Sequence, residues 1–426
     1  MSERTYPEAF LKRMERELGE DFPRYLAAMN KPPNKALCIN TIKTDRAELS
    51  ALLGLDLAPL KENPDGAALP SDFNPNATPF HAAGLFYMQE ASAQSPVAAT
   101  PLFDAPVVLD LCAAPGGKSA QLAAKMRGGV LLANEIVPSR ASVLSGNLER
   151  MGVTNAIVTN SDPHTLCERV FGQCDAVLVD APCAGEGMFR KDPGAVTEWS
   201  EAHVEACAVR QRAILEDAVK AVKPGGTLTY ATCSFSRQEN EETVERFLDA
   251  HPDFSCLEMR RLYPHASAGE GQFYALLQKA GTREPSAFPI GKSDRVPAFE
   301  AFSDAVRLKK GQIRLLKDGR VLLLPPMPVS LDGVKIVRAG LLLGEVKGNR
   351  FEPAHALCMA GRTPPLKNTA ELSFDEAMRF LRGETIEKPA EKGYGAATVR
   401  GHALGLYKAS DGVLKNHYPK GLRLLK

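Results

Sequence analysis

The stretch Val-Val-Leu-Asp-Leu-Cys-Ala-Ala-Pro-Gly-Gly-Lys-Ser, at residues 107–119, decides the fold of this chain. Residues 107–111 are mostly apolar and favour extended structure, which is typical of a strand buried on both faces. A Pro-Gly-Gly turn follows, and the residues from Ser119 onward predict a helix. In a strand, turn and helix of this kind, backbone N–H groups and the helix N-terminus face a ligand just beyond the strand.

Strand and helix patterns alternate regularly from this stretch to about residue 280. The predicted strands cover residues 107–111, 130–134, 156–159, 176–180, 227–232 and 273–278. The predicted helices cover residues 139–151, 198–222 and 240–250. This alternation predicts an α/β fold at residues 95–280, with a Rossmann-like, doubly wound and mostly parallel sheet.

The two flanks show other patterns. Residues 1–94 combine helical spacing with a strand at 36–42, which predicts a small N-terminal α+β unit. After residue 281 the sequence predicts a hairpin with a turn at Asp318-Gly319, a helix and further short strands. The helix covers residues 374–381, and the short strands cover residues 341–343, 403–407 and 422–425. We therefore expect an intermediate segment at residues 281–345 and a β-rich C-terminal module at residues 346–426.

The formal net charge of +1 hides an asymmetry along the chain. Residues 281–426 hold 25 Lys and Arg against 15 Asp and Glu, whereas residues 1–280 hold 27 against 36. A basic C-terminal third on an acidic body favours a polyanionic partner. A lysine-rich solvated surface explains the same counts equally well, so charge alone leaves both interpretations open.

Composition disfavours several classes of protein. No apolar run approaches the length of a membrane span, and the first residues lack the apolar core of a signal peptide. The nine cysteines are scattered without paired spacing, which favours reduced thiols over a disulfide framework. No Cys-x-x-Cys pair or His cluster indicates a metal site. We expect a monomeric cytoplasmic protein with no bound metal and no membrane attachment.

Polar or reactive side chains recur where the predicted strands end, and ligands of open α/β sheets bind at those ends. These residues are Asp110, Cys112, Glu135, Asp162, Asp180, Cys183 and Cys233. Glu135 lies about twenty residues after the glycine turn, where a carboxylate would accept hydrogen bonds from a ribose. Asp162, at the next strand end, could meet an adenine edge. A nucleoside cofactor explains this series better than isolated helix caps, because the carboxylates recur at successive strand ends.

Two other nucleotide sites fit the glycine turn less well. Gly117-Lys118-Ser119 resembles the end of a P-loop, but Cys112 occupies the position of its first glycine. The Gly-x-Gly-x-x-Gly pattern of dinucleotide folds is missing from Ala-Ala-Pro-Gly-Gly-Lys. ATP, GTP and dinucleotides are therefore minor alternatives.

Two cysteines point to the chemistry. Cys183 lies in Val-Asp-Ala-Pro-Cys-Ala-Gly-Glu-Gly and Cys233 in Tyr-Ala-Thr-Cys-Ser-Phe-Ser, and each directly follows a predicted buried strand. A partly exposed thiol near helix N-termini favours the thiolate and is therefore nucleophilic. The cysteines within helix or loop patterns, such as Cys167, Cys207 and Cys256, are interpreted as inert.

Methylation of a pyrimidine at carbon is a reaction that needs these groups. A thiolate that adds to C6 of cytosine gives an enamine, whose C5 can attack a sulfonium methyl group. A second group then assists loss of the C5 proton and elimination, and a nearby carboxyl can hydrogen-bond N3 or N4. Enzymes that methylate nitrogen tend to carry Asn/Asp-Pro-Pro-Tyr/Phe where this chain has Asp-Ala-Pro-Cys at residues 180–183. Reasoning from the residues alone does not rank Cys183 against Cys233 as the nucleophile.

Motifs from one end of the chain to the other resemble those of one known family. They lie at residues 87–90, 108–119, 150–152, 179–189, 230–235 and 269–273. Together they resemble the Nop/Sun family of RNA cytosine-C5 methyltransferases. The runs at residues 185–191 and 415–422 resemble the bacterial RsmF type within this family.

The resemblance implies S-adenosylmethionine as the cofactor. The residues that would line its site are Cys112, Ala113, Ala114, Pro115, Gly116, Gly117 and Lys118. Glu135 would hold the ribose, Asp162 would lie on the adenine side, and Asp180 would lie at the methyl group and the target base. The family's nucleophile is the cysteine of the Thr-Cys-Ser motif, here Cys233, while the Pro-Cys cysteine, here Cys183, assists product release. DNA cytosine methyltransferases attack with the Pro-Cys cysteine, so that analogy would instead have selected Cys183.

The resemblance also implies that residues 1–94 contact RNA and that residues 346–426 form a PUA-like RNA-binding domain. The candidates for phosphate contact are Arg400, Lys408, Lys415, His417, Lys420 and Arg423. The expected substrate is an unstacked cytosine of small-subunit (16S) ribosomal RNA, free or in the small ribosomal subunit. Transfer RNA as substrate, and a ribosome-assembly factor whose methylation is incidental, remain alternatives at this point.

Overall fold

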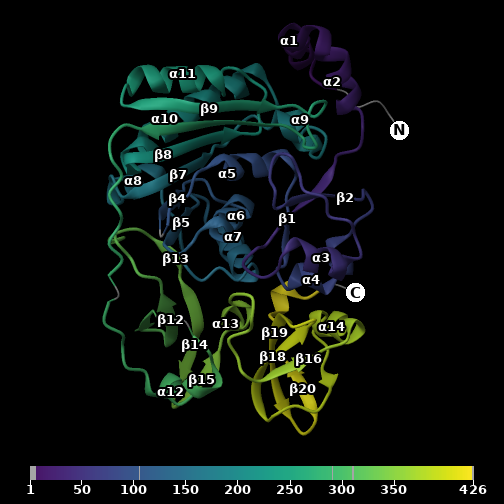
Figure 1. Cartoon of the computed structure of the whole chain (residues 1–426), viewed down its shortest axis with the longest axis vertical. Coiled ribbons are helices and arrows are strands. Elements are labelled where there is room, and N and C mark those ends of the chain that lie inside the picture. The colour runs from purple at the N-terminus through teal and green to yellow at the C-terminus, as the bar shows by residue number, and fades with distance from the viewer. Residues whose placement is uncertain (1–5, 105, 290, 309–310, 425–426) are drawn as a thin grey trace.

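The computed structural model describes residues 6–104, 106–289, 291–308 and 311–424. These residues form four sheets. Figure 1 shows the large central sheet in the upper half of the molecule and two strand-rich parts in the lower half. The central sheet carries the strand ends at which the sequence predicts the site.

The central sheet has the strand order β13-β6-β5-β4-β7-β8-β10-β9. The five strands from β6 to β8 in this order pair in parallel, and β13, β10 and β9 add antiparallel at the two edges. The bounds are β4 (Val107–Asp110), β5 (Val130–Asn134), β6 (Ala156–Thr159), β7 (Cys174–Asp180), β8 (Val222–Thr232), β9 (Phe254–Leu262), β10 (Gln272–Lys279) and β13 (Ile336–Ala339). The predicted mostly parallel α/β sheet is confirmed.

Helices cover both faces of this sheet, so the doubly wound architecture is confirmed as well. The helices on one face are α5 (Ser95–Ala99), α6 (Gly117–Lys125) and α7 (Pro138–Arg150). Those on the other face are α8 (Pro163–Arg169), α10 (Glu201–Ala221) and α11 (Glu241–Ala250). Because the central strands are covered on both sides, every residue of β4, β5 and β6 is buried.

The central domain differs from the prediction in three places. The helix predicted at residues 198–222 is α10, which begins only at Glu201 because a separate helix, α9 (Pro193–Glu198), ends just before it. Trp199 is extended between them, and the Ser200 hydroxyl caps α10 by accepting the N–H of His203. The edge strands β9 and β13 are additional to the predicted strands. β13 lies within the predicted intermediate segment at residues 281–345 and pairs with β6.

The N-terminal unit packs against the loop that follows β7. It contains a small sheet of order β2-β1-β3, in which all pairs are antiparallel. Its elements are α1 (Glu8–Leu18), α2 (Phe22–Met29), β1 (Lys35–Ile39), α3 (Arg46–Leu53), β2 (Gly66–Leu69), α4 (Pro79–Ala82) and β3 (Phe86–Met88). Phe10 and Met14 of α1 share a buried cluster with Phe189 and Trp199. The N-terminal helices therefore cover the segment that carries Cys183.

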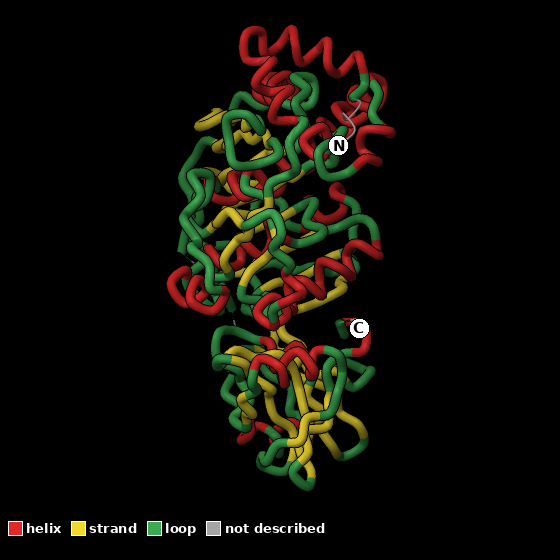
Figure 2. Tube along the Cα trace, turned by 90° about the vertical axis from the view of Figure 1, so that its right-hand side faces the viewer, coloured by secondary structure: helices red, strands yellow, loops and turns green. Residues whose placement is uncertain are grey.

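Two further sheets form the strand-rich end of the molecule, which Figure 2 shows below the helix-rich end. The elements of the first are α12 (Pro297–Glu300), β11 (Gln312–Leu315), β12 (Arg320–Leu324), β14 (Leu341–Lys347), β15 (Arg350–Pro353) and α13 (His355–Met359). Those of the second are β16 (Thr369–Glu371), α14 (Phe374–Leu381), β17 (Ile386–Glu387), β18 (Gly393–Val399), β19 (His402–Ser410) and β20 (Val413–Asn416). Within the described residues, no helix combines the length and apolar character needed to cross a bilayer.

Four of the predicted C-terminal elements are confirmed and one is wrong. β11 and β12 form the predicted antiparallel hairpin, α14 covers the predicted helix, and β14 and β19 contain the strands predicted at residues 341–343 and 403–407. The strand predicted at residues 422–425 is not formed by its described part. Lys420–Leu422 is a 3-10 turn, and the N–H of Leu424 donates to the carbonyl of Leu381 rather than to a neighbouring strand. Leu425 lies outside the described residues.

A buried lysine joins three parts of the molecule. Lys43 follows β1, and its Nζ donates to the carbonyl oxygens of Ala83, at 2.7 Å, and of Arg150, at 3.1 Å. Arg150 ends α7, so these bonds tie the N-terminal unit to the central domain, and Cys358 of α13 lies close enough to affect the amine. Burial lowers the pKa of Lys43 to about 7.

The stability contributed by Lys43 should therefore depend on pH. Its pKa in the unfolded chain is about 10.4, so between pH 7 and 10 the unfolded chain binds more protons at this residue than the folded one. Stability from this group consequently rises with pH across that window, by about 1.4 kcal/mol per pH unit at most. We expect the thermal midpoint of the wild type to rise relative to that of Lys43→Met between pH 7 and 10. Parallel pH profiles for the two proteins would contradict this assignment.

Candidate active site

The turn after β4 is held by the helices on its own face of the sheet. Gly116 adopts a φ of +112°, which favours glycine, and α6 begins at the next residue. The carbonyl oxygen of Ala114 accepts from Arg140, at 3.0 Å, and that of Pro115 accepts from Asn147, at 2.9 Å. Both donors belong to α7, so the backbone of the turn is fixed before any ligand binds.

A buried carboxyl lies directly beneath the turn. Asp110 accepts a 2.6 Å hydrogen bond from the Ser119 hydroxyl at Oδ2. Its Oδ1 has no hydrogen-bond partner among the described residues, and burial raises the pKa of Asp110 to about 7. An unpaired polar atom under a glycine turn and a helix N-terminus fits a polar ligand bound over the turn.

Glu135 and Asp162 lie at the ends of the neighbouring strands β5 and β6. Glu135 is buried, and its carboxylate accepts from the N–H of Val137, at 2.9 Å, with Arg140 3.5 Å away. Asp162 caps α8 by accepting the N–H of Thr165 at 2.9 Å, which is the structural role weighed above against an adenine contact. That backbone hydrogen bond is also the main reason why the pKa of Asp162 is lowered.

Two exposed apolar side chains next to Glu135 were not singled out from the sequence. Ile136 is 58% exposed and Val137 is 40% exposed, although both follow a fully buried strand. An exposed apolar pair beside a carboxylate offers a surface for the flat face of a base. The signal that could have found them is their place immediately after a carboxylate at a strand end.

A pocket of about 190 Å³ opens where β7 and β8 end. It is lined by Glu90, Ala93, Lys118, Asp180, Ala181, Gly187, Met188, Cys233, Gly271 and Gln272. The Nζ of Lys118, in the first turn of α6, lies 2.8 Å from Oδ2 of Asp180. The structure therefore brings Lys118, Asp180 and Cys233 together at one opening, as the strand-end argument predicts.

The two strand-end cysteines touch each other. Cys183 Sγ lies 3.2 Å from Cys233 Sγ, and both residues are half-buried. The pKa of Cys183 is raised well above its ordinary value, mainly by the hydrogen bond to Cys233 and then by burial. Either thiol can donate in this contact, so the two sulfurs can share one proton between them. Cys233 lines the pocket, whereas Cys183 is not among the lining residues.

The buried carboxylate of Glu239 holds the loop that carries Cys183 against the loop that carries Cys233, an arrangement we call the Glu239 clamp. Its Oε1 accepts from the N–H of Ala184 and from Nε2 of Gln211, each at 2.9 Å, and its Oε2 accepts from the Ser234 hydroxyl. Gln211 also donates to the carbonyl of Pro182 at 3.0 Å. The residues next to Cys183 and Cys233 are thus fixed to one side chain, and burial raises the pKa of that side chain.

A second buried carboxylate, Glu186, fixes the same loops to the N-terminal helices. It accepts from Arg13 of α1 at 2.6 Å, from the indole N–H of Trp199 at 2.8 Å and from the N–H of Phe235 at 2.8 Å. Because Phe235 lies two residues after Cys233, α1 reaches the loop of Cys233 through a single side chain. Neither Glu186 nor Glu239 was predicted, since their partners lie elsewhere in the sequence.

The far wall of the pocket is built by Glu90 and the segment before β10. Glu90 accepts from the Ser92 hydroxyl at 2.7 Å and from the N–H of Glu270 at 2.9 Å. Gly271 has a φ of +137°, and a Cβ there would lie 2.3 Å from the ring of Phe235. Only glycine allows this close approach. Because Glu90 and Gly271 both line the pocket, the motifs at residues 87–90 and 269–273 form part of its wall.

The predicted RNA contacts do not form a single cluster. Lys408 and Lys415 pair across β19 and β20, and Lys408 Nζ lies 4.8 Å from the centre of the Tyr394 ring, with the His417 ring 5.5 Å from that ring. We call Lys408, Lys415, His417 and Tyr394 the β-sheet patch. Lys420 is exposed in the last 3-10 turn, whereas Arg423 is half-buried against Gly383.

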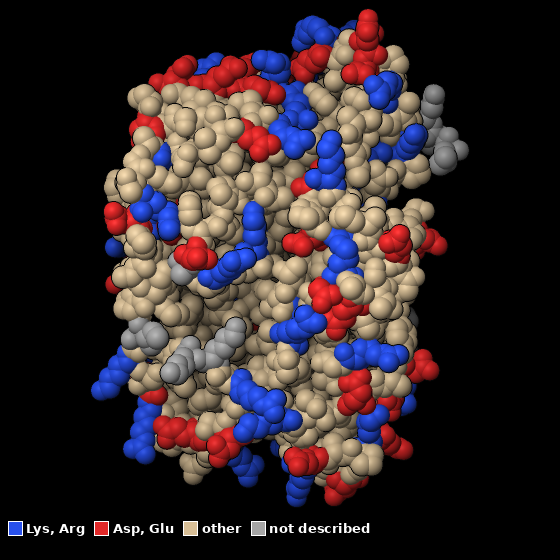
Figure 3. All heavy atoms as spheres, in the orientation of Figure 1, with Lys and Arg blue, Asp and Glu red and all other residues tan. Residues whose placement is uncertain are grey.

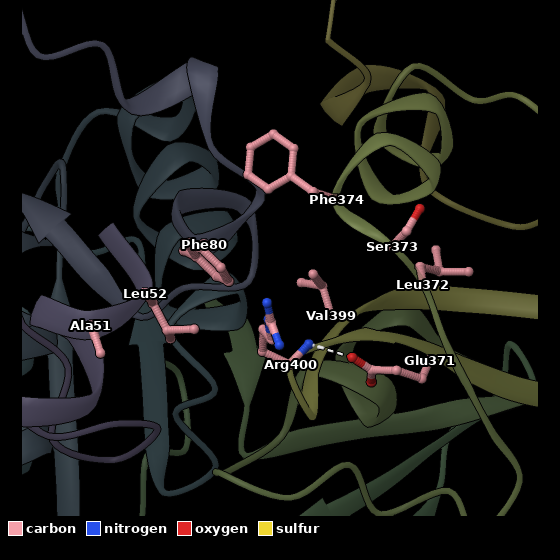
Figure 4. A pocket seen from close by; sticks show the side chains of 9 residues that line it. All are labelled: Ala51, Leu52, Phe80, Glu371, Leu372, Ser373, Phe374, Val399 and Arg400. Atoms are coloured by element: carbon pink, nitrogen blue, oxygen red, sulfur yellow. Dashed lines mark hydrogen bonds between the residues drawn. The ribbon is translucent and has the colours of Figure 1, made fainter. Parts of the chain in front are cut away.

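Arg400 lies at the opposite end of the β18–β19 hairpin from this patch. It lines a groove of about 700 Å³ between α3 and α4 of the N-terminal unit and α14. Figure 4 shows Arg400 at this groove with Leu52, Phe80 and Phe374 around the opening, and the N–H of Arg400 bonded to Glu371. Arg400 is exposed, but it is separated from Lys408 by the length of the hairpin.

Solved structures share the central fold. A methyltransferase homolog protein from Pyrococcus horikoshii is 30% identical, with a TM-score of 0.58 over 64% of this chain and 95% of that chain. NSun6 from Pyrococcus horikoshii, solved with SFG, is 20% identical, with a TM-score of 0.56 over 65% of this chain and 99% of that chain. The fold and the strand-end pocket define an S-adenosylmethionine-dependent methyltransferase.

Family models match the chain in four consecutive pieces. Residues 102–278 match the 16S rRNA methyltransferase RsmB/F family, and the three RsmF-specific models are an N-terminal domain at 6–91, a first C-terminal domain at 301–360 and a PUA domain at 367–424. Ribosomal RNA small subunit methyltransferase F of Escherichia coli O9:H4 (strain HS) is 33% identical over 98% of this chain and 96% of its own length. The protein of the same name in Cronobacter sakazakii is 34% identical over the same shares. The chain therefore belongs to the RsmB/F family of 16S rRNA methyltransferases.

Glu239 should act as a positioning residue for both cysteines. In Glu239→Gln the neutral amide has the same shape but no longer accepts hydrogen bonds at both ends, and a hydrogen bond to a charged group contributes about 1.5–3 kcal/mol. We expect kcat for methyl transfer to fall at least about tenfold, with the Kd for S-adenosylmethionine unchanged. The control is Glu245→Gln, which removes an exposed carboxylate of α11 nearby in sequence. Equal kcat values for the two variants would contradict the positioning role.

Proposed function

We propose that this chain methylates C5 of cytosine in 16S rRNA through a covalent bond between Cys233 and C6 of the base. The observation that carries the proposal is the 3.2 Å approach of the Cys183 and Cys233 sulfurs beside Asp180, at the ends of adjacent strands. Methylation at nitrogen needs no sulfur nucleophile, whereas C5 of cytosine becomes nucleophilic only after addition at C6. The RsmB/F family membership supports 16S rRNA as the substrate.

We assign the nucleophile to Cys233 because Cys233 lines the pocket, whereas Cys183 does not. The Cys233 sulfur forms the bond to C6, and the Cys183 sulfur lies 3.2 Å behind it, within reach for a hydrogen bond. Asp180, paired with Lys118, would accept a hydrogen bond from the N4 amino group of the base.

Bound S-adenosylmethionine supplies the electrophilic methyl group that C5 takes up. The demethylated cofactor leaves as its neutral thioether, S-adenosylhomocysteine. A solvent water then takes the C5 proton, the electrons of the C5–H bond restore the C5–C6 double bond, and the Cys233 sulfur leaves with the electrons of the C6–S bond. The Cys183 thiol, held 3.2 Å away, donates its hydrogen bond to the departing thiolate and so assists release. The Glu239 clamp keeps the two sulfurs at this distance throughout.

The cofactor would be held by the turn between β4 and α6. Its residues are Cys112, Ala113, Ala114, Pro115, Gly116, Gly117 and Lys118. Glu135 would bind the ribose hydroxyls, and the exposed Ile136 would lie against the base. Asp162, which stays the cap of α8, would face the adenine edge, while Asp180 would lie nearest the methyl group.

For the RNA we propose contacts by the units on either side of the methyltransferase domain at residues 95–280. Residues 1–94 would contact the RNA near the pocket, and the module at residues 346–426 would hold it through the β-sheet patch. The segment at residues 281–345 would connect the two, and the enzyme would act in the cytoplasm on the free RNA or the small subunit. Phosphates are the groups that Lys408 and Lys415 fit, and Tyr394 offers a face for an unstacked base.

The two cysteines should give opposite results when they are substituted. We expect Cys233→Ala to abolish methyl transfer without forming an adduct, because no sulfur attacks C6. We expect Cys183→Ala to accumulate a covalent protein–RNA adduct, because release of Cys233 is slowed. Denaturing gel electrophoresis with labelled 16S rRNA and S-adenosylmethionine measures both outcomes. An adduct with Cys233→Ala and none with Cys183→Ala would reverse the assignment, and substitution without effect in both would refute the covalent mechanism.

The β-sheet patch should contribute to the salt dependence of RNA binding. Each phosphate contact that is lost lowers the slope of log Kobs against log salt by about one, so we expect Lys408→Gln with Lys415→Gln to lower it by about two. The control is Lys317→Gln with Lys367→Gln, which removes two exposed lysines outside the patch. Identical slopes for the two double variants would contradict the proposed patch.

A further inference from the structure

The pocket that Cys233 lines is called the cysteine pocket below. A second pocket, of about 450 Å³, lies beside it. It is lined by Arg24, Ala27, Ala28, Lys31, Asn34, Arg190, Pro264 and His265. These residues come from α2, from the segment after it, and from two loops of the central domain. A volume of this size falls within the range of small-ligand sites, and we call it the α2 pocket.

The α2 pocket and the cysteine pocket share a wall. Arg190, with its side chain 3% exposed, donates to Glu270 at 2.7 Å and to the carbonyl of Ala28 at 3.0 Å. Gly187 and Met188, a few residues before Arg190, line the cysteine pocket, and so does Gly271, next to Glu270. A chain that enters one pocket is therefore placed to continue into the other.

The wall is a built structure rather than a chance gap between loops. The Arg190 guanidinium also lies within hydrogen-bond reach of the carbonyl of Gly269, at 3.4 Å, and Glu270 accepts the N–H of Asn34 at 2.9 Å. This buried pair fixes the segment after α2 to the segment before β10. The charge of Arg190 is neutralised by Glu270, so the remaining charge of the pocket comes from Arg24 and Lys31.

The lining of the α2 pocket is cationic. Among its described lining residues there are three basic side chains and no Asp or Glu. Lys31 is exposed and has no ion-pair partner among the described residues, and Arg24 has only the exposed Asp21, at 2.9 Å. An exposed pair of this kind contributes little, so Arg24 can exchange Asp21 for a stronger anion. Figure 3 shows basic side chains over α2 and α9, whereas acidic ones line the upper edge over α11.

The pocket also offers groups that suit a base or sugar. Ala27, Ala28 and Pro264 supply apolar surface, and the His265 ring stacks on Tyr263 at a centroid distance of 5.6 Å. The Nδ1 atom of His265 is buried without a hydrogen-bond partner among the described residues. Burial lowers the pKa of His265, so its ring is neutral at physiological pH and free to make a hydrogen bond.

We propose that the α2 pocket binds a nucleotide of the substrate RNA that flanks the target cytosine, with its phosphate at Lys31 and Arg24. This inference rests on the proposed function, since it needs RNA to reach the cysteine pocket. A site that combines an unpaired lysine, an arginine with one exposed and exchangeable partner, a stacked ring and an unpaired ring nitrogen matches a nucleotide better than a bare anion. The larger pocket between α1 and α10 is lined by four basic side chains and by four carboxylates, so its charges balance, whereas the described lining of the α2 pocket has no carboxylate.

The test compares Lys31→Gln and Arg24→Gln with Lys317→Gln, which removes an exposed lysine from the β11–β12 turn. A labelled 16S rRNA fragment that the wild type methylates is titrated at several salt concentrations without cofactor. We expect each of the first two variants to raise Kd and to lower the salt slope by about one, while the control leaves both unchanged. In methylation assays we expect KM for the RNA to rise by more than kcat falls.

Slopes and KM values equal to those of Lys317→Gln would overturn the inference. Normal binding to the naked RNA together with weakened binding to the assembled subunit would also overturn it, because the pocket would then contact a ribosomal protein. Absence of C5 methylation by the wild type would instead refute the proposed function, and the binding slopes would still decide whether Lys31 and Arg24 contact RNA. The two failures are therefore distinguishable.

Discussion

The contact on which the site depends is the clamp that Glu239 makes between the loops of Cys183 and Cys233. Its carboxylate accepts from the Ala184 N–H and the Ser234 hydroxyl, so one buried group spaces two sulfurs that belong to different strands. A buried carboxylate needs such donors, because burying one of its oxygens without a hydrogen bond costs free energy. The 3.2 Å separation of the sulfurs is therefore a property of the fold rather than of the bound substrate.

Around this centre, buried ion pairs attach the outer units to the central sheet. The ion pair of Arg13 with Glu186 joins α1 to the loop of Cys233. The ion pair of Arg190 with Glu270 joins the segment after α2 to the far wall of the cysteine pocket. Lys43 adds an attachment of another kind, through hydrogen bonds to two backbone carbonyls. Removing one partner of such a pair leaves an uncompensated buried charge, so these contacts fix how the units face the pocket. The basic surfaces of the N-terminal unit and of the C-terminal module are then held in fixed positions relative to Cys233.

The sequence predicted what depends on local pattern. Strand periodicity located β4 to β8, and their ends revealed Asp180, Cys183 and Cys233, because parallel strands bring their carboxyl ends to one edge. β9 was missed because only its end residues Phe254 and Leu262 are buried, so the strand has no alternation of apolar and polar residues to mark it. Glu90 and Glu270 were missed for a different reason: their backbone contact joins positions 180 residues apart, and nothing local marks either partner. The positions of the six basic residues predicted to contact RNA also depend on tertiary structure. Arg400 and Lys408, for example, lie at opposite ends of the β18–β19 hairpin.

The central claim is that this chain methylates C5 of cytosine in 16S rRNA through Cys233. The most direct measurement is bisulfite sequencing of 16S rRNA from cells with and without the protein, since a C5 methyl group protects cytosine from deamination. The account predicts at least one cytosine that is protected in the wild type, is deaminated when the protein is absent, and regains protection with the wild-type chain but not with Cys233→Ala. The same set of protected cytosines in all of these cells would contradict it.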